Sequence, residues 1–171
     1  ERILDVGCGT GTFAAMLARR APGARLTGLD PDEEVLAHAA RKLEGLKVEL
    51  RRGFARDAAN AGEASFDKVV SSLVFHQIPL AEKRAGFEAM FRALKPKGEL
   101  HFADYGLQRT PLMRGLFRQV QRLDGFDNTE PNALGMLPEL MRDAGFVGVE
   151  ERLVVPTPTG SISLYAARKV G

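Results

Sequence analysis

The chain of 171 residues has the length of one globular domain. Its 24 Lys and Arg residues against 22 Asp and Glu residues give a formal charge of +2, and no stripe of basic residues indicates a nucleic-acid surface. No apolar run approaches the roughly 20 residues of a membrane-spanning helix. The single cysteine, Cys8, excludes an intrachain disulfide, so we expect a cytoplasmic protein that does not use a membrane.

The first segment predicts a short buried strand that runs directly into a glycine-rich turn. The strand covers residues 3–6, and Gly7, Gly9 and Gly11 follow at every second position. Glycine permits positive φ and a close approach of the backbone to a ligand. The helical composition of residues 12–18 places free N–H groups and a positive dipole end behind the turn. The pattern indicates a ligand site, and the alternative is a tight strand-to-helix turn that binds nothing.

Strand and helix patterns then alternate up to about residue 104, which is typical of a parallel sheet with helices on both faces. We expect further strands at residues 24–30, 46–50, 66–73 and 99–104, the second of these at an edge of the sheet. We expect helices over residues 12–21, 31–43 and 81–94. Residues 53–65 are rich in Gly, Ala and acids and predict a loop with at most a helical turn.

The rhythm changes after residue 104. Apolar residues at helical spacing predict an amphipathic helix over residues 110–125. Residues 127–132 predict a polar loop, and residues 134–144 another helix. Two strands at 146–155 and 162–169, joined by a short loop without a helix, predict an antiparallel hairpin.

The glycine turn resembles motif I of the class I S-adenosylmethionine-dependent methyltransferases. Asp5 lies two residues before the first glycine, as it does in that motif, and Thr12 stands where the dinucleotide fingerprint requires its third glycine. This spacing disfavours an NAD(P) oxidoreductase. The resemblance covers residues 1–171 and implies one Rossmann-like, doubly wound, mostly parallel seven-stranded sheet that ends in an antiparallel hairpin. It also implies that the family's usual N-terminal helices are missing, and that residues 110–132 form a substrate-lid insertion.

S-adenosyl-L-methionine is the cofactor that the resemblance implies. Its residues would lie along the turn and the next strand end, namely Asp5, Gly7, Cys8, Gly9, Thr10, Gly11, Asp30 and Pro31. Asp30 ends the second strand and is suited to accept hydrogen bonds from ribose hydroxyls, although it also suits a helix N-cap. By resemblance, Asp5 holds the amino acid end of the cofactor. The alternative is that Asp5 bonds only to the N–H groups of the turn.

The adenine partner departs from the family pattern. The family usually places a Gly-Asp pair after the third strand, and here Phe54 follows Gly53 while Asp57 comes three residues later. Phe54 is suited to stack on adenine and Asp57 to bond its exocyclic amine. Each is equally compatible with an ordinary loop residue.

Candidates for catalysis and for the acceptor side follow the fourth and fifth strands, because ligands bind beyond the carboxyl ends of strands in open sheets. Ser71 and Ser72 end the fourth strand and are expected beside the cofactor. His76 is a candidate general base and Tyr105 a candidate acceptor-site residue. The alternatives are a histidine that only shapes the pocket and a tyrosine that only walls it.

These observations predict methyl transfer to O, N or C of a small-molecule acceptor. The alternatives are a non-catalytic domain that binds S-adenosylmethionine or S-adenosylhomocysteine, and a methyltransferase that acts on protein or RNA. The Asn/Asp-Pro-Pro-Tyr/Phe tetrapeptide of nucleic-acid base methyltransferases is absent, which disfavours a nucleic-acid partner. No metal site is expected, and the sequence leaves the oligomeric state open, a homodimer included.

Overall fold

Seven strands form one sheet in the computed structural model, which describes residues 1–171. They are β1 (Arg2–Val6), β2 (Arg25–Asp30), β3 (Val48–Arg52), β4 (Phe66–Ser72), β5 (Leu94–Tyr105), β6 (Val147–Thr157) and β7 (Gly160–Arg168). Their order is β3-β2-β1-β4-β5-β7-β6. Strands β1 to β5 are parallel to one another, and β7 is antiparallel to both β5 and β6. The predicted mostly parallel sheet with a C-terminal hairpin is confirmed, with β3 at an edge.

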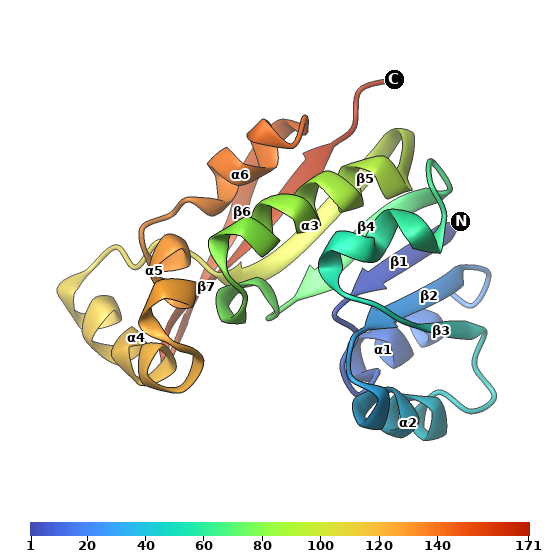
Figure 1. The fold of residues 1–171 in the computed structure, drawn as a ribbon, viewed down its shortest axis with the longest axis horizontal. Helices are drawn as coiled ribbons and strands as arrows, with labels where there is room; N and C mark the ends of the chain where they lie inside the picture. Colours follow the sequence, from blue (N-terminus) through green and yellow to red (C-terminus); the bar gives the residue numbers. More distant parts are fainter.

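Helices cover both faces of this sheet, as predicted (Figure 1). The helical segments are α1 (Thr12–Arg20), α2 (Glu33–Lys42), η1 (Ala55–Ala61), η2 (Phe75–Gln77), α3 (Leu80–Ala93), α4 (Pro111–Asp124), α5 (Phe126–Ala133) and α6 (Leu137–Asp143). Core residues of η1, α3 and α6 pack in one cluster, and core residues of α1 and α2 pack in a second. Strand β4 contributes Val69 to the first cluster and Val70 to the second, because successive strand side chains point to opposite faces.

One predicted loop is a helix, and the largest boundary shifts are at the start of the last helix and of β5. Residues 127–132 are part of α5, because two of their polar side chains, Thr129 and Asn132, are buried and bonded rather than solvated. Thr129 donates from Oγ1 to the Gly125 carbonyl at 2.7 Å, and Asn132 donates from Nδ2 to the Tyr105 carbonyl at 2.9 Å. The last helix begins at Leu137 rather than at residue 134, and β5 begins at Leu94 rather than at residue 99.

Helices α4 and α5 project beyond the sheet at the end away from the N-terminus (Figure 1). Phe117 and Val120 of α4 and Ala133 of α5 form a small core of their own, against which Tyr105 packs. The expected helix over 110–125 is confirmed as α4, with Thr110 as its N-cap. The segment therefore lies beside the carboxyl ends of the parallel strands. No helix in the structure is both long enough and apolar enough to cross a bilayer.

We predict that Phe87→Ala lowers the free energy of unfolding by about 3–5 kcal/mol, the usual cost of a large aromatic cavity. Phe87 is fully buried on α3, with ring centroids 4.7 Å from Phe75 and 5.1 Å from Phe102. Urea unfolding measures the change. Leu123→Ala is the control, because Leu123 is 85% exposed and its truncation is expected to cost less than about 0.5 kcal/mol. Equal losses in the two variants would contradict this core.

Candidate functional site

A cavity of about 710 Å³ opens at the carboxyl ends of the parallel strands. Its walls come from the turn after β1, the end of β2, the segment after β3, the end of β4 and the first turn of α3. Most of the predicted cofactor residues line it, namely Asp5, Gly7, Cys8, Gly9, Thr10, Asp30, Pro31, Phe54 and Ser72. Gly11, Asp57 and Ser71 do not line it, and neither do His76 and Tyr105.

The glycine turn has the backbone that its sequence predicts. Gly7, Gly9 and Gly11 have φ of +73°, +52° and +75°, which side chains rarely adopt. A Cβ on Gly7 would lie 2.2 Å from Cγ2 of Val74, whereas a Cβ on Gly9 would meet no atom within 4 Å. The turn therefore packs tightly against the rest of the protein at Gly7. At Gly9 it has open space beside it, so the backbone of Gly9 is accessible from the cavity.

Asp30 connects the end of β2 to this turn. Its Oδ2 accepts from the Gly9 N–H at 3.0 Å, and its Oδ1 accepts from the Asp32 N–H at 3.1 Å. The N-cap of α2 is Asp32 instead, whose Oδ1 accepts from the Glu34 and Val35 N–H groups. The N-cap alternative for Asp30 therefore does not apply. Each Asp30 oxygen keeps a lone pair for a ligand.

Asp5 is a buried carboxylate without a full set of partners. It is 1% exposed, lines the cavity, and its Oδ2 has no hydrogen-bond partner. Burial and the nearby charge of Asp30 raise the pKa of Asp5 from 3.8 to about 7. Buried polar atoms in native proteins are nearly always bonded, so an orphaned oxygen at a cavity wall is suited to a donor or cation from a ligand.

The segment after β3 presents Phe54 to the cavity and turns Asp57 inward. Asp57 accepts from the Phe54 N–H at 2.9 Å through its Oδ2 and so caps its own turn. The Phe54 side chain is 50% exposed, with the guanidinium of Arg56 4.6 Å from its ring centroid. Of the two candidates for contact with the base, Phe54 is the one at the cavity.

The two catalytic candidates lie in a buried polar cluster beneath α4. His76 is 5% exposed, with Nδ1 2.7 Å from Oδ1 of Asp104 and Nε2 3.5 Å from Oδ2 of Asp124. Asp104 also accepts through Oδ2 from the N–H groups of Val74 and Phe75 at 3.1 and 2.7 Å. Both ring nitrogens of His76 therefore face carboxylates of the protein.

Tyr105 and Ser71 likewise have partners within the protein. The hydroxyl of Tyr105 lies 2.7 Å from Oγ1 of Thr159, and its ring centroid is 5.0 Å from that of His76. Ser71 is buried and donates to the Val6 carbonyl at 2.8 Å. Ser71 lines a second cavity of about 470 Å³ along β4, β5 and β7. These two side chains have structural contacts that account for their positions.

The cavity is also lined by residues that were not among the expected site residues, including Leu73, Gln77, Arg56 and Glu82. Leu73 has φ of +58°, a strained conformation for a leucine at the end of a strand, and no sequence signal marks it. Gln77 lies in the segment after β4, where the sequence predicts the acceptor side of the site. Glu82 lies inside an expected helix, where a carboxylate gives no signal of a ligand site.

We predict that replacing Asp5 flattens part of the pH dependence of stability. Between about pH 4 and about pH 7 the folded state keeps the Asp5 proton that the unfolded state has lost, so stability falls as pH rises. From about pH 5 to about pH 8, wild type should lose on the order of 2 kcal/mol more than Asp5→Asn. Urea unfolding at both pH values measures this. Equal losses would contradict a raised pKa.

Comparison with known proteins identifies the family. Residues 3–98 match the family model described as a methyltransferase domain. Demethylmenaquinone methyltransferase of Thermus thermophilus is 36% identical over 126 residues, which are 72% of this chain and 54% of that protein. A ubiquinone biosynthesis O-methyltransferase of Pseudomonas fluorescens is 35% identical over 105 residues, 60% of this chain and 44% of that protein. The chain thus spans about half the length of the curated relatives it matches.

Solved structures agree on the fold. A SAM-dependent methyltransferase from Methanosarcina mazei superposes with a TM-score of 0.76 and 24% identity, covering 99% of this chain and 92% of that one. At this identity the likeness shows the fold alone. Because the family model covers more than half of its residues, the chain belongs to the family of methyltransferase domains.

Proposed function

We propose that the domain binds S-adenosylmethionine in the 710 Å³ cavity and catalyses transfer of its methyl group to O, N or C of a small molecule. The observation that carries the proposal is the arrangement of Asp5, Asp30 and the positive-φ glycine turn around one cavity. A glycine turn alone is compatible with many nucleotides. The family match supports the methyl donor over those alternatives.

The residues present fit this cofactor. The orphaned Oδ2 of Asp5 is suited to the ammonium of its amino acid end, either directly or through a water molecule. The free lone pairs of Asp30 are suited to the ribose hydroxyls. The open face of Gly9 permits the close approach that such a ligand needs.

The bound cofactor supplies a carbon activated by its sulfonium, so that the protein has no difficult bond to activate itself. The residues of the chain bind, orient and exclude water, and proximity of this kind supplies about 7–11 kcal/mol. The proposal therefore does not require a general base. Both ring nitrogens of His76 face carboxylates of the protein, so the geometry favours a role in holding the local structure over proton transfer with the acceptor.

A small-molecule acceptor is the part of the proposal that rests on the relatives. Their names refer to demethylmenaquinone and to ubiquinone biosynthesis. We further propose that residues 110–132, which include α4 and most of α5, form the lid over the acceptor. Asn128 of α5 donates to the carbonyl of Gln77 at 3.0 Å, and Gln77 lines the cavity.

A cytoplasmic location belongs to the same proposal and is consistent with a free, buried Cys8.

Calorimetric titration with S-adenosylmethionine and S-adenosylhomocysteine tests the function. We expect both to bind at one site per chain, and we expect no binding of NADH in a parallel absorbance titration. If neither sulfur nucleoside bound, or if NADH bound in their place, the proposal would be wrong.

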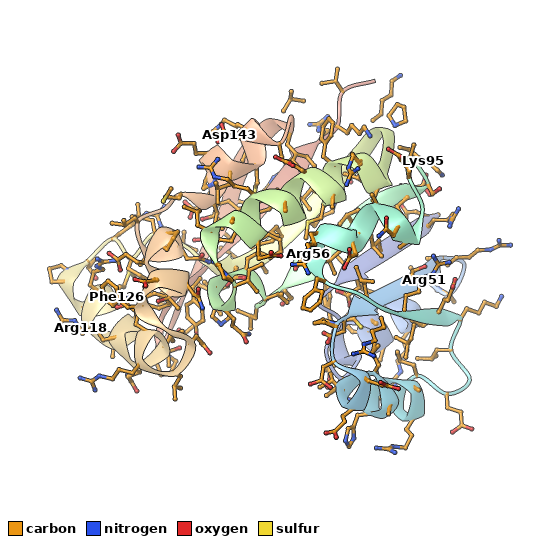
Figure 2. The ribbon with its side chains drawn as sticks, viewed as in Figure 1. Arg51, Arg56, Lys95, Arg118, Phe126 and Asp143 are labelled. Carbon is orange, nitrogen blue, oxygen red and sulfur yellow. The ribbon has the colours of Figure 1, made fainter.

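We predict that Asp30→Asn weakens S-adenosylhomocysteine binding by about tenfold, because it removes a charged acceptor worth roughly 1.5–3 kcal/mol. The amide oxygen can still accept from the Gly9 N–H, while the bond to the Asp32 N–H is lost, so thermal unfolding verifies that the variant is folded. Asp143→Asn is the matched control, because Asp143 lies on α6 well away from Arg56 at the cavity (Figure 2). Unchanged affinity in Asp30→Asn would contradict a contact with the ribose.

A further inference from the structure

The wall of the cavity formed by η1 and the first turn of α3 carries three side chains, one of which contacts the other two. Arg56 projects between η1 and α3 (Figure 2). Its guanidinium lies 4.6 Å from the ring centroid of Phe54, and its Nη1 is 2.7 Å from Oε2 of Glu82. All three residues line the cavity. Arg56 thus contacts both an aromatic ring and a carboxylate on one wall of the cavity.

Glu82 differs from the other carboxylates of the cavity. Four carboxylates line it, and three of them, Asp5, Asp30 and Asp32, come from the ends of β1 and β2. Glu82 is the only one on the Phe54 wall. Its Oε2 faces Arg56, which leaves its Oε1 outside this ion pair. The Glu82 side chain is 35% exposed, so that this oxygen is available to a ligand.

The chemistry of this wall matches a flat base that carries an amine. The Phe54 ring offers an aromatic surface, and Val35, Ile78 and Pro79 add apolar lining. A carboxylate oxygen only accepts hydrogen bonds, so it distinguishes a base with an exocyclic amine from one with an oxygen at the same place. The aspartate expected after β3 is replaced by Phe54, and Asp57 is used within its own turn. The wall would lack an acidic acceptor without Glu82.

We infer that Glu82 accepts a hydrogen bond from the exocyclic amine of an aminopurine bound beside Phe54, and that Arg56 is a positioning residue for both side chains. The inference rests on the proposed function, because it assumes that the cavity takes an adenine nucleoside. It assigns the recognition of the amine to α3 rather than to the segment after β3.

A purely structural role for Glu82 makes a different prediction. Glu82 lies in the first turn of α3, where an acid complements the helix dipole, and its pair with Arg56 is partly exposed. In that case its replacement would alter stability or the binding of any nucleoside, without favouring one base over another. Discrimination between two bases is therefore the readout that separates the two roles.

The experiment compares S-adenosylhomocysteine with S-inosylhomocysteine, in which an oxygen replaces the exocyclic amine, by calorimetric titration of the whole chain. We expect wild type to prefer the adenosyl compound by about tenfold or more. In Glu82→Gln the preference should fall to within about threefold, because an amide can accept from an amine or donate to an oxygen. Glu82→Met should bind the adenosyl compound about tenfold more weakly than wild type. Arg56→Met should reduce the same preference, because it removes the ion pair that positions Glu82.

Glu88→Gln is the control, because it makes the same charge change on the exposed face of α3 and should keep the wild-type preference. Thermal unfolding verifies that each variant is folded. If wild type binds S-adenosylhomocysteine and Glu82→Gln keeps the full preference, the inference is wrong while the proposed function stands. If wild type binds neither compound, both are wrong.

Discussion

The hydrogen bond from the Gly9 N–H to the Asp30 carboxylate, 3.0 Å long, is the contact on which the site depends. It joins the end of β2 to the turn after β1, and it is possible only because the backbone at Gly7 and Gly9 adopts positive φ. Gly7 and Cys8 add N–H bonds to the Leu29 carbonyl at 2.7 and 3.0 Å. Two neighbouring parallel strands thus end at one fixed loop, and the cavity opens above it.

This arrangement concentrates negative charge where the cavity begins. Burial raises the pKa of Asp5, and the nearby charge of Asp30 raises it further. A buried carboxylate without a partner lowers the stability of the domain. The site therefore has an unmet demand for a cation or donors, which a ligand carrying an ammonium and two hydroxyls would satisfy. The buried Asp5 beside Asp30 thus has two consequences: it lowers the stability of the free domain, and it favours the binding of such a ligand.

The sequence predicted the parts of the structure that depend on local chemistry. The glycine turn and Asp5 were predicted from their spacing and its resemblance to a known motif, and Asp30 from its place at the end of the second strand. The alternation of strands and helices predicted the confirmed sheet. The sequence did not predict α5, because Thr129 and Asn132 are polar residues typical of a solvated loop, and their buried hydrogen-bond partners are seen only in the structure. It did not predict Glu82 either, since only the packing of α3 against η1 brings that residue to the cavity. His76 was predicted as a base from its residue type and its place after the fourth strand, whereas its surroundings depend on Asp124, which is 48 residues away in the sequence.

The most direct test of the central claim is a crystal structure of the chain with S-adenosylhomocysteine. We expect the ribose hydroxyls to lie within hydrogen-bond distance of Asp30, with the amino group of the ligand facing Asp5 and the base beside Phe54. A nucleoside bound outside the cavity, or bound in it with Asp30 turned away from the sugar, would contradict the proposed site.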